Sequence, residues 1–144
     1  MQARTLSMIA STAAVLLAGC GSGGGAASSP TPSSTPNLAA RPPSPAVLQI
    51  VSPSNGEVVT GSTVHVQVAV TNAHVVAVTS TNIHPDQGHV HLYLDQALIY
   101  MQYSLQQDVP VHPGTYQLKA EFVASDHVPF NPRVWSQQVV FTVR

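Results

Sequence analysis

The sequence predicts an all-β fold, a β-sandwich, over residues 46–144. Several short segments alternate apolar and polar residues with a period of two, the pattern of strands that rest one face on a core. Clusters of Gly, Pro, Asn, Asp and Ser separate these segments at intervals of about 8–12 residues, as in known sandwiches. No stretch keeps a helical period over about ten residues, so we expect no long helix.

Seven or eight strands are expected, and two of them show the alternation most clearly. In residues 63–70 a valine occupies every second position and points inward. In residues 115–123 one face carries Tyr116, Leu118, Ala120 and Phe122. Asp95 and Gln96 are expected at the tip of a hairpin. The other predicted strands are 47–51, an irregular piece at 73–79, 88–95, 97–103, 105–111 and 138–143.

The charged residues exclude one class of function. They make up only 8% of the 144 residues, and beyond residue 45 three basic side chains stand against six acidic ones. No basic stripe is present to neutralise phosphates, so we expect no nucleic-acid binding. The chain has a single cysteine, Cys20, and therefore cannot form an intrachain disulfide.

Residues 1–19 have the layout of an export signal. Arg4 precedes an apolar run at 6–18 that is too short to span a bilayer, which needs about 20 residues. The run ends in Leu17-Ala18-Gly19-Cys20, which resembles the lipobox of bacterial lipoproteins. The resemblance implies cleavage before Cys20 and acyl chains such as palmitate on it. It also implies anchoring on the extracytoplasmic side of the cell membrane. The alternative is an ordinary secretory signal with a chance cysteine.

Residues 20–45 are expected to be a tether that begins at the lipidated Cys20. Of the 25 residues from 21 to 45, 16 are Gly, Ser or Pro. Such a segment has almost nothing apolar to bury, so we expect it to be disordered. The predicted organisation is a signal at 1–19, a tether at 20–45 and a sandwich at 46–144.

The predicted strand 88–95 carries the clearest chemical signal. His89 and His91 lie two residues apart, so they share one face of the strand, about 7 Å apart at the backbone. Two imidazoles at this spacing can hold one metal ion. The same spacing is compatible with two ordinary surface histidines.

A second segment indicates which part of the chain lies beside these histidines. His112-Pro113-Gly114-Thr115-Tyr116 resembles the entry into strand F of immunoglobulin-like and fibronectin-type domains, where a tyrosine hydroxyl bonds back to the backbone. In that topology strand 88–95 runs antiparallel to strand 115–123. His127 would then approach His89 and His91, with Asp126 as a further ligand or as the acceptor behind a ligating histidine. Imidazole suits Zn and Cu, the two metals we consider.

Three segments together resemble a family. Residues 85–95, 113–116 and 124–133 carry a Gly-His-x-His, Leu-Asp, Pro-Gly and Asp-His-x-Pro pattern. The pattern is similar to that of small exported bacterial domains of unknown function, which implies fold and export but no reaction. The His-x-His strand is also similar to one in copper/zinc superoxide dismutase. This chain lacks that enzyme's cysteine pair and further His/Asp ligands, so we do not expect dismutase activity.

The remaining candidates are interpreted as structural. Met101 is expected to pair with Val90 and to face the core. Trp135 and Phe130 are expected to cover a sandwich edge rather than to stack on a sugar. The other histidines are expected to face solvent or to lie in turns: His65, His74, His84 and His112.

No enzyme activity is expected. The chain has no Gly-x-Ser-x-Gly elbow, no cysteine in the domain and no glycine-rich loop leading into a helix. The expected function is therefore a membrane-anchored binding module with an unknown protein or small-molecule partner. It would bind copper or zinc through His89, His91, His127 and Asp126. The alternative is a non-catalytic interaction or structural domain of the cell envelope without metal.

Overall fold

The computed structural model describes residues 36–144, and every structural statement below concerns this part of the chain. The expected export signal, Cys20 and most of the expected tether lie outside it. The described residues contain one short 3-10 helix, η1 (Leu38–Ala40), and ten strands: β1 (Val47–Ser52), β2 (Val58–Val59), β3 (Thr63–Thr71), β4 (His74–Val75), β5 (Gln87–Leu94), β6 (Ala97–Gln102), β7 (Gln106–Pro110), β8 (Gly114–Ala124), β9 (Pro129–Trp135) and β10 (Val139–Val143).

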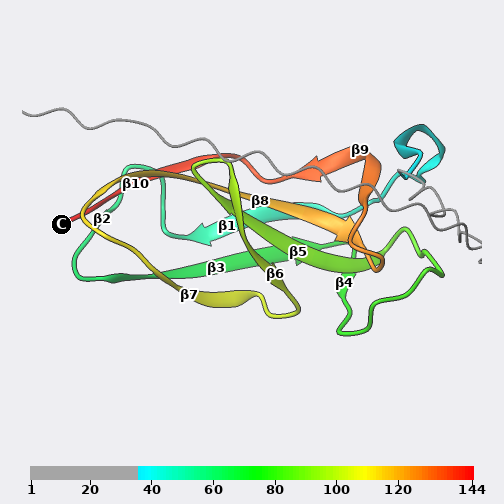
Figure 1. The fold of residues 1–144 in the computed structure, drawn as a ribbon, viewed down its shortest axis with the longest axis horizontal. Helices are drawn as coiled ribbons and strands as arrows, with labels where there is room; N and C mark the ends of the chain where they lie inside the picture. The colour runs from blue at the N-terminus through cyan, green and yellow to red at the C-terminus, as the bar shows by residue number, and fades with distance from the viewer. Residues whose placement is uncertain (1–35) are drawn as a thin grey trace, which may run out of the picture. The chain divides into compact units, whose positions relative to one another are not determined.

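The strands form two sheets, and the predicted β-sandwich is confirmed (Figure 1). The smaller sheet has the order β1-β3-β7 and is antiparallel throughout. In the larger sheet β5 and β8 are the central pair. Strands β4 and β6 both pair with β5, while β9 and β10 both pair with β8. Strand β2 is paired in parallel with β10.

The apolar residues of the alternating segments fill the space between the two sheets. Val64, Val66 and Val68 of β3 are buried, as the valine pattern predicts. They belong to one core cluster with the apolar face of β8, where Leu118 and Phe122 are fully buried. Apolar burial of this kind stabilises by about 25 cal/mol per Å² and must stabilise the domain without a disulfide. Phe130 lies in this core, stacked on Phe122 with ring centroids 5.9 Å apart.

The corner before β8 forms as the sequence predicts. The Tyr116 hydroxyl donates to the carbonyl oxygen of His112 at 2.9 Å. The same hydroxyl oxygen accepts a hydrogen bond from the His112 backbone N–H at 3.2 Å. The tyrosine thus closes the turn through Pro113 and Gly114 and fixes where β8 begins.

The expectation that Met101 faces the core is wrong. Asp95 and Gln96 do form a two-residue hairpin tip, both with positive φ angles, of 48° and 72°. However, the β5–β6 register shifts after Leu92, because β6 contains a bulge there. Met101 therefore pairs with His91 instead of Val90 and is 56% exposed.

Part of the expected tether packs onto the sandwich. The Arg41 guanidinium bonds both oxygens of Asp126, at 2.8 and 2.9 Å, and the Asn131 N–H donates to the carbonyl oxygen of Pro42. Contacts to the domain therefore begin before residue 46. The sequence does not predict these contacts, because the segment has the composition of a linker and its main contacts are made by one arginine and not by apolar residues.

We predict that Gly88→Ala destabilises the domain by at least about 2 kcal/mol. A Cβ atom at Gly88 would overlap the carbonyl oxygen of Val123 on the neighbouring strand, and backbone cannot move aside cheaply. Urea unfolding followed by circular dichroism measures the loss. The matched control is Gly114→Ala, where the nearest atom, on the Tyr116 ring, is 3.7 Å away. Equal stability of the two variants would contradict the β5–β8 register.

Candidate functional site

Three histidines that the sequence singles out lie together at one end of the larger sheet. Strand β5 supplies His89 and His91, and the turn between β8 and β9 supplies His127. The His127 ring stacks on His89 with centroids 4.2 Å apart and on His91 with centroids 5.6 Å apart. The cause is the antiparallel β5–β8 register, in which Gly88 lies opposite Ala124, so that β5 begins where β8 ends.

The two strand histidines are not surface residues. His89 is fully buried and His91 is only 5% exposed. The His127 ring covers them from one side, and the Tyr103 ring packs edge-on against His89 with centroids 4.9 Å apart. The interpretation as ordinary surface histidines is therefore wrong, because the turn and the neighbouring strand cover this face.

Each ring nitrogen has a distinct environment. The Nε2 atom of His89 donates to the carbonyl oxygen of Ser125 at 3.0 Å, so in the neutral ring the Nδ1 atom carries the lone pair. That Nδ1 atom is buried and has no hydrogen-bond partner among residues 36–144. Nε2 of His91 lies 3.3 Å from Nδ1 of His127. On its other side the His127 ring meets the Thr79 hydroxyl at 3.2 Å.

Burial favours the neutral form of two of these imidazoles, His91 and His127. Burial, and then the proximity of His127, lowers the pKa of His91 to about 4. Burial and the neighbouring His89 lower the pKa of His127 as well. Neutral imidazole is the form that binds metal, so protons compete weakly for these nitrogens.

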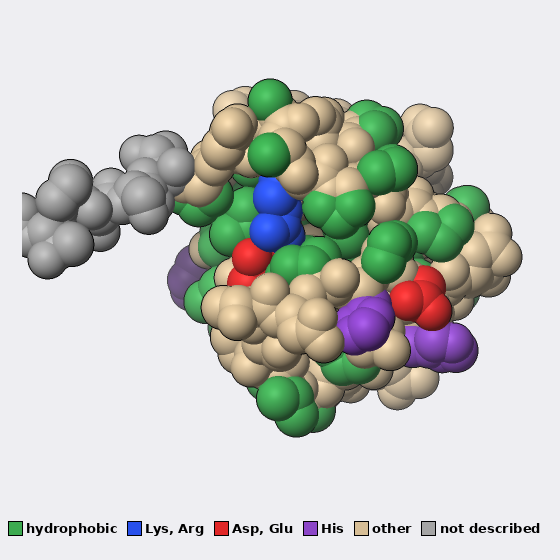
Figure 2. All heavy atoms as spheres, turned by 90° about the vertical axis from the view of Figure 1, so that its right-hand side faces the viewer, with side chains coloured by type: hydrophobic (Ala, Val, Ile, Leu, Met, Phe, Trp, Pro, Cys, Tyr) green, Lys and Arg blue, Asp and Glu red, His purple; other side chains and the backbone are tan. Residues whose placement is uncertain are grey.

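Asp126 pairs with Arg41, whereas the sequence suggests that it lies against the histidines. Both of its carboxylate oxygens accept from Arg41, and one also accepts from the Val128 N–H at 3.1 Å. Arg41 donates in addition to the carbonyl oxygens of Val128 and Pro129. Asp126 thus anchors the turn that carries His127 rather than facing the imidazoles. Figure 2 shows a basic side chain against an acidic one at this end of the domain, with histidines on the same face.

The backbone of His127 is held in an uncommon conformation. Its φ angle is +63°, in the left-handed region that residues other than glycine seldom adopt. The His127 N–H donates to the carbonyl oxygen of Ala124 at 2.9 Å, which closes the turn. Strain of this kind persists where surrounding contacts enforce it, and here the Arg41–Asp126 pair does so.

A second polar cluster lies beside the first, and the sequence analysis did not identify it. Glu121 pairs across strands with His91, is fully buried, and accepts hydrogen bonds from Arg133 and from the Tyr93 hydroxyl at 3.1 Å. Burial, and then Glu121, raises the pKa of Tyr93, and Glu121 raises the pKa of Arg133. The sequence carries no separate signal for it, because Glu121 follows Gln117 and Lys119 on the polar face of β8 and resembles an exposed strand residue.

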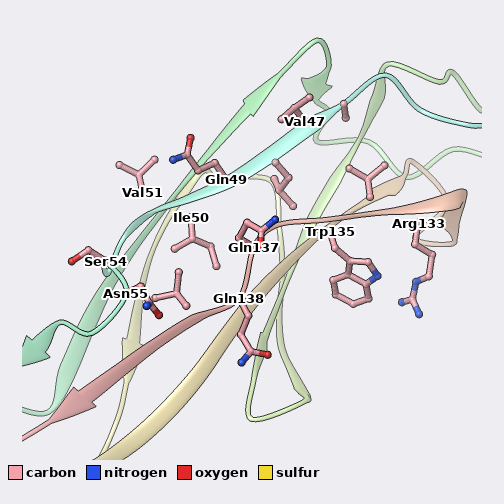
Figure 3. A pocket seen from close by; sticks show the side chains of 14 residues that line it. Val47, Gln49, Ile50, Val51, Ser54, Asn55, Arg133, Trp135, Gln137 and Gln138 are labelled. Carbon is pink, nitrogen blue, oxygen red and sulfur yellow. The ribbon is translucent and has the colours of Figure 1, made fainter.

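A groove of about 830 Å³ opens between β1 and the segment that joins β9 to β10 (Figure 3). Trp135 lies on its wall, and the indole is flanked by Lys119 Nζ at 4.3 Å and by Arg133 at 4.6 Å from the ring centroid. These cation–π contacts, together with Tyr93 at 5.2 Å, account for the position of the indole at the sheet edge. The groove walls also carry Gln49, Asn55, Gln137 and Gln138.

The other histidines lie where the sequence predicts. His74, His84 and His112 are exposed, and exposed His65 pairs across strands with Asp108 at 2.7 Å. None of them adjoins the β5 cluster in the contacts found among the described residues. They provide matched controls for substitutions in the cluster.

No family model matches the chain, and no curated protein shows significant similarity to it. Within residues 36–144, no three or more His, Cys, Asp or Glu side chains are arranged so that they could hold one metal ion together. The same residues include no helix long and apolar enough to cross a membrane.

The lowered pKa of His91 predicts a specific dependence of stability on pH. The unfolded chain protonates this imidazole near pH 6.5 and the folded domain near pH 4, so the unfolded state binds more protons in between. The contribution of His91 is fully present above pH 6.5 and is lost as the pH falls towards 4, by up to about 3 kcal/mol.

Urea unfolding between pH 4 and pH 7 measures this loss as the difference between wild type and His91→Gln. The variant should show a shallower fall in the free energy of unfolding, and the control His74→Gln should follow wild type. Parallel curves for wild type and His91→Gln would show that His91 is not buried in its neutral form.

Proposed function

We propose that this chain is an exported, lipid-anchored domain that binds a copper or zinc ion between His91 and His127, in the cluster that these two residues form with His89. The observation that carries the proposal is the 3.3 Å separation of His91 Nε2 and His127 Nδ1. Two nitrogens that each lie about 2.0–2.1 Å from one tetrahedral ion are separated by about this distance. A metal ion would take the place of the hydrogen between them, with a turn of the rings that aims both lone pairs at it.

The buried nitrogen of His89 supports a ligand at this place. An unpaired acceptor in a buried site costs about 1–3 kcal/mol, and the Nδ1 atom of His89 has no partner among residues 36–144. Its ring lies directly against His127. A ligand that satisfies this atom would remove the cost. In this proposal Asp126 fixes the turn of His127 through Arg41 and is not itself a ligand.

A second function is favoured by another observation. The three rings stack, and His89 already donates to Ser125, which is how a packed cluster without metal would also be held. On that reading the chain is a non-catalytic interaction or structural domain of the cell envelope. Neither proposal assigns an enzymatic reaction, and both place the domain at the extracytoplasmic membrane surface through acylated Cys20.

Metal titration separates the two functions. The full chain carrying Cys20→Ser, which cannot be acylated at that sulfur, should bind Zn(II) or Cu(II) in calorimetry at pH 7. Metal at a hundredfold excess over the dissociation constant should raise the free energy of unfolding by about 2.7 kcal/mol. His91→Ala should abolish binding, because it removes one of the paired nitrogens, while His74→Ala should bind as wild type does.

Two outcomes would support the function without metal. One is binding weaker than about 10 μM for both ions. The other is unchanged binding by His91→Ala. Because His91→Ala also opens a buried site, its folding is checked by circular dichroism, and His127→Ala, at the partly exposed ligand, is tested alongside it.

The lipid anchor has its own test. Cys20→Ala should release the protein from the membrane fraction or leave its signal uncleaved, since the sulfur that would carry diacylglycerol is lost. Fractionation followed by mass spectrometry of the mature N-terminus measures both effects. A wild-type protein without acyl chains on Cys20 would contradict the proposed anchor and would leave the metal proposal intact.

A further inference from the structure

The β-bulge in β6 places a possible sulfur ligand, Met101, beside the histidines. In an antiparallel pair, opposite residues point to the same face with Cβ atoms about 4.5–5.5 Å apart. Met101 lies opposite His91, so its thioether is on the histidine face of the sheet. Without the bulge this side chain would point into the core.

The neighbouring contacts confirm that the cluster faces β6. Tyr103 follows directly after the end of β6, and its ring packs against His89 with centroids 4.9 Å apart. The His127 ring lies 6.4 Å from the Tyr103 ring, although its turn leaves from β8 on the opposite side of β5. The turn thus reaches across β5 and places His127 on the side where Met101 stands.

The exposure of Met101 is otherwise unexplained by packing. Its side chain is 56% exposed at an edge strand, in a domain whose core is complete without it. Methionine has three rotatable side-chain bonds, so its sulfur can reach a point beside the neighbouring imidazoles. Soft thioether sulfur selects Cu(I), whereas imidazole alone suits Zn(II) and Cu(II) as well.

We infer that the metal of this site is Cu(I), held by His91, His127 and the sulfur of Met101. This inference rests on the proposed metal-binding function and names the ion. It also supplies a third ligand, which the His, Cys, Asp and Glu side chains of the described residues do not provide as arranged. His89 supports His127 by stacking on its ring.

The test compares Met101→Leu with wild type, both in the full chain carrying Cys20→Ser. Leucine is an apolar side chain of similar volume that lacks the sulfur. Cu(I) affinity is measured anaerobically by competition with a chromophoric Cu(I) chelator, and Zn(II) affinity by calorimetry. We expect Met101→Leu to weaken Cu(I) binding by about tenfold or more and to leave Zn(II) affinity within about twofold.

A matched control is Leu98→Ala, which removes another exposed apolar side chain from the same strand and should leave Cu(I) affinity unchanged. X-ray absorption of the Cu(I) form provides a direct readout, because a sulfur neighbour should be present in wild type and lost in Met101→Leu. Absence of sulfur around copper, or equal Cu(I) affinity of the two proteins, overturns the role of Met101.

The outcomes separate the two proposals. This inference is overturned, and the proposed function still stands, if Zn(II) binding depends on His91 but Cu(I) does not bind. The same holds if Cu(I) binds equally well to wild type and to Met101→Leu. No binding of either ion overturns both.

Discussion

The pairing of β5 with β8 is the constraint on which the other features depend. Seven residue pairs run from Gly88–Ala124 to Leu94–Leu118 and fix both faces of the larger sheet. Inward, this register aligns Val90 with Phe122 in the core. Outward, it places His91 beside Glu121 and begins the histidine strand where the turn of His127 leaves. The close approach of the two backbones requires glycine at position 88.

Polar groups are buried in two different ways on the outer face of the neighbouring strands β5 and β8. Glu121 is buried as an ion whose charge is offset by Arg133, since a lone buried carboxylate would be very costly. His91 and His127 avoid that cost because burial lowers the pKa of each ring and so favours its neutral form. One outer face thus carries a closed ion pair beside a neutral cluster with one unsatisfied nitrogen. Only the second arrangement leaves bonding capacity for a ligand.

The sequence predicts those features that depend on local pattern. Period-two alternation identifies the strands, and the Pro-Gly-Thr-Tyr corner indicates the topology that brings His127 to His89 and His91. It does not predict features that depend on distant partners. The bulge that turns Met101 away from the core depends on how β6 pairs with β5. The role of Arg41 depends on Asp126, which lies 85 residues further along the chain. Buried Glu121 looks like any polar strand residue until Arg133 is placed beside it.

The turn that carries His127 is held by contacts outside the apolar core. The core at this end is completed by Phe122 and Phe130, neither of which needs the imidazole. Yet the turn holds His127 at a left-handed φ angle, which costs about 1–3 kcal/mol for such a residue. The bidentate Arg41–Asp126 pair offsets this cost, and that arginine comes from the segment just before β1. Glycine at position 127 would relieve this strain but would lose the ring that stacks on His89 and lies beside His91, so the turn accepts a backbone cost to keep the imidazole in the cluster.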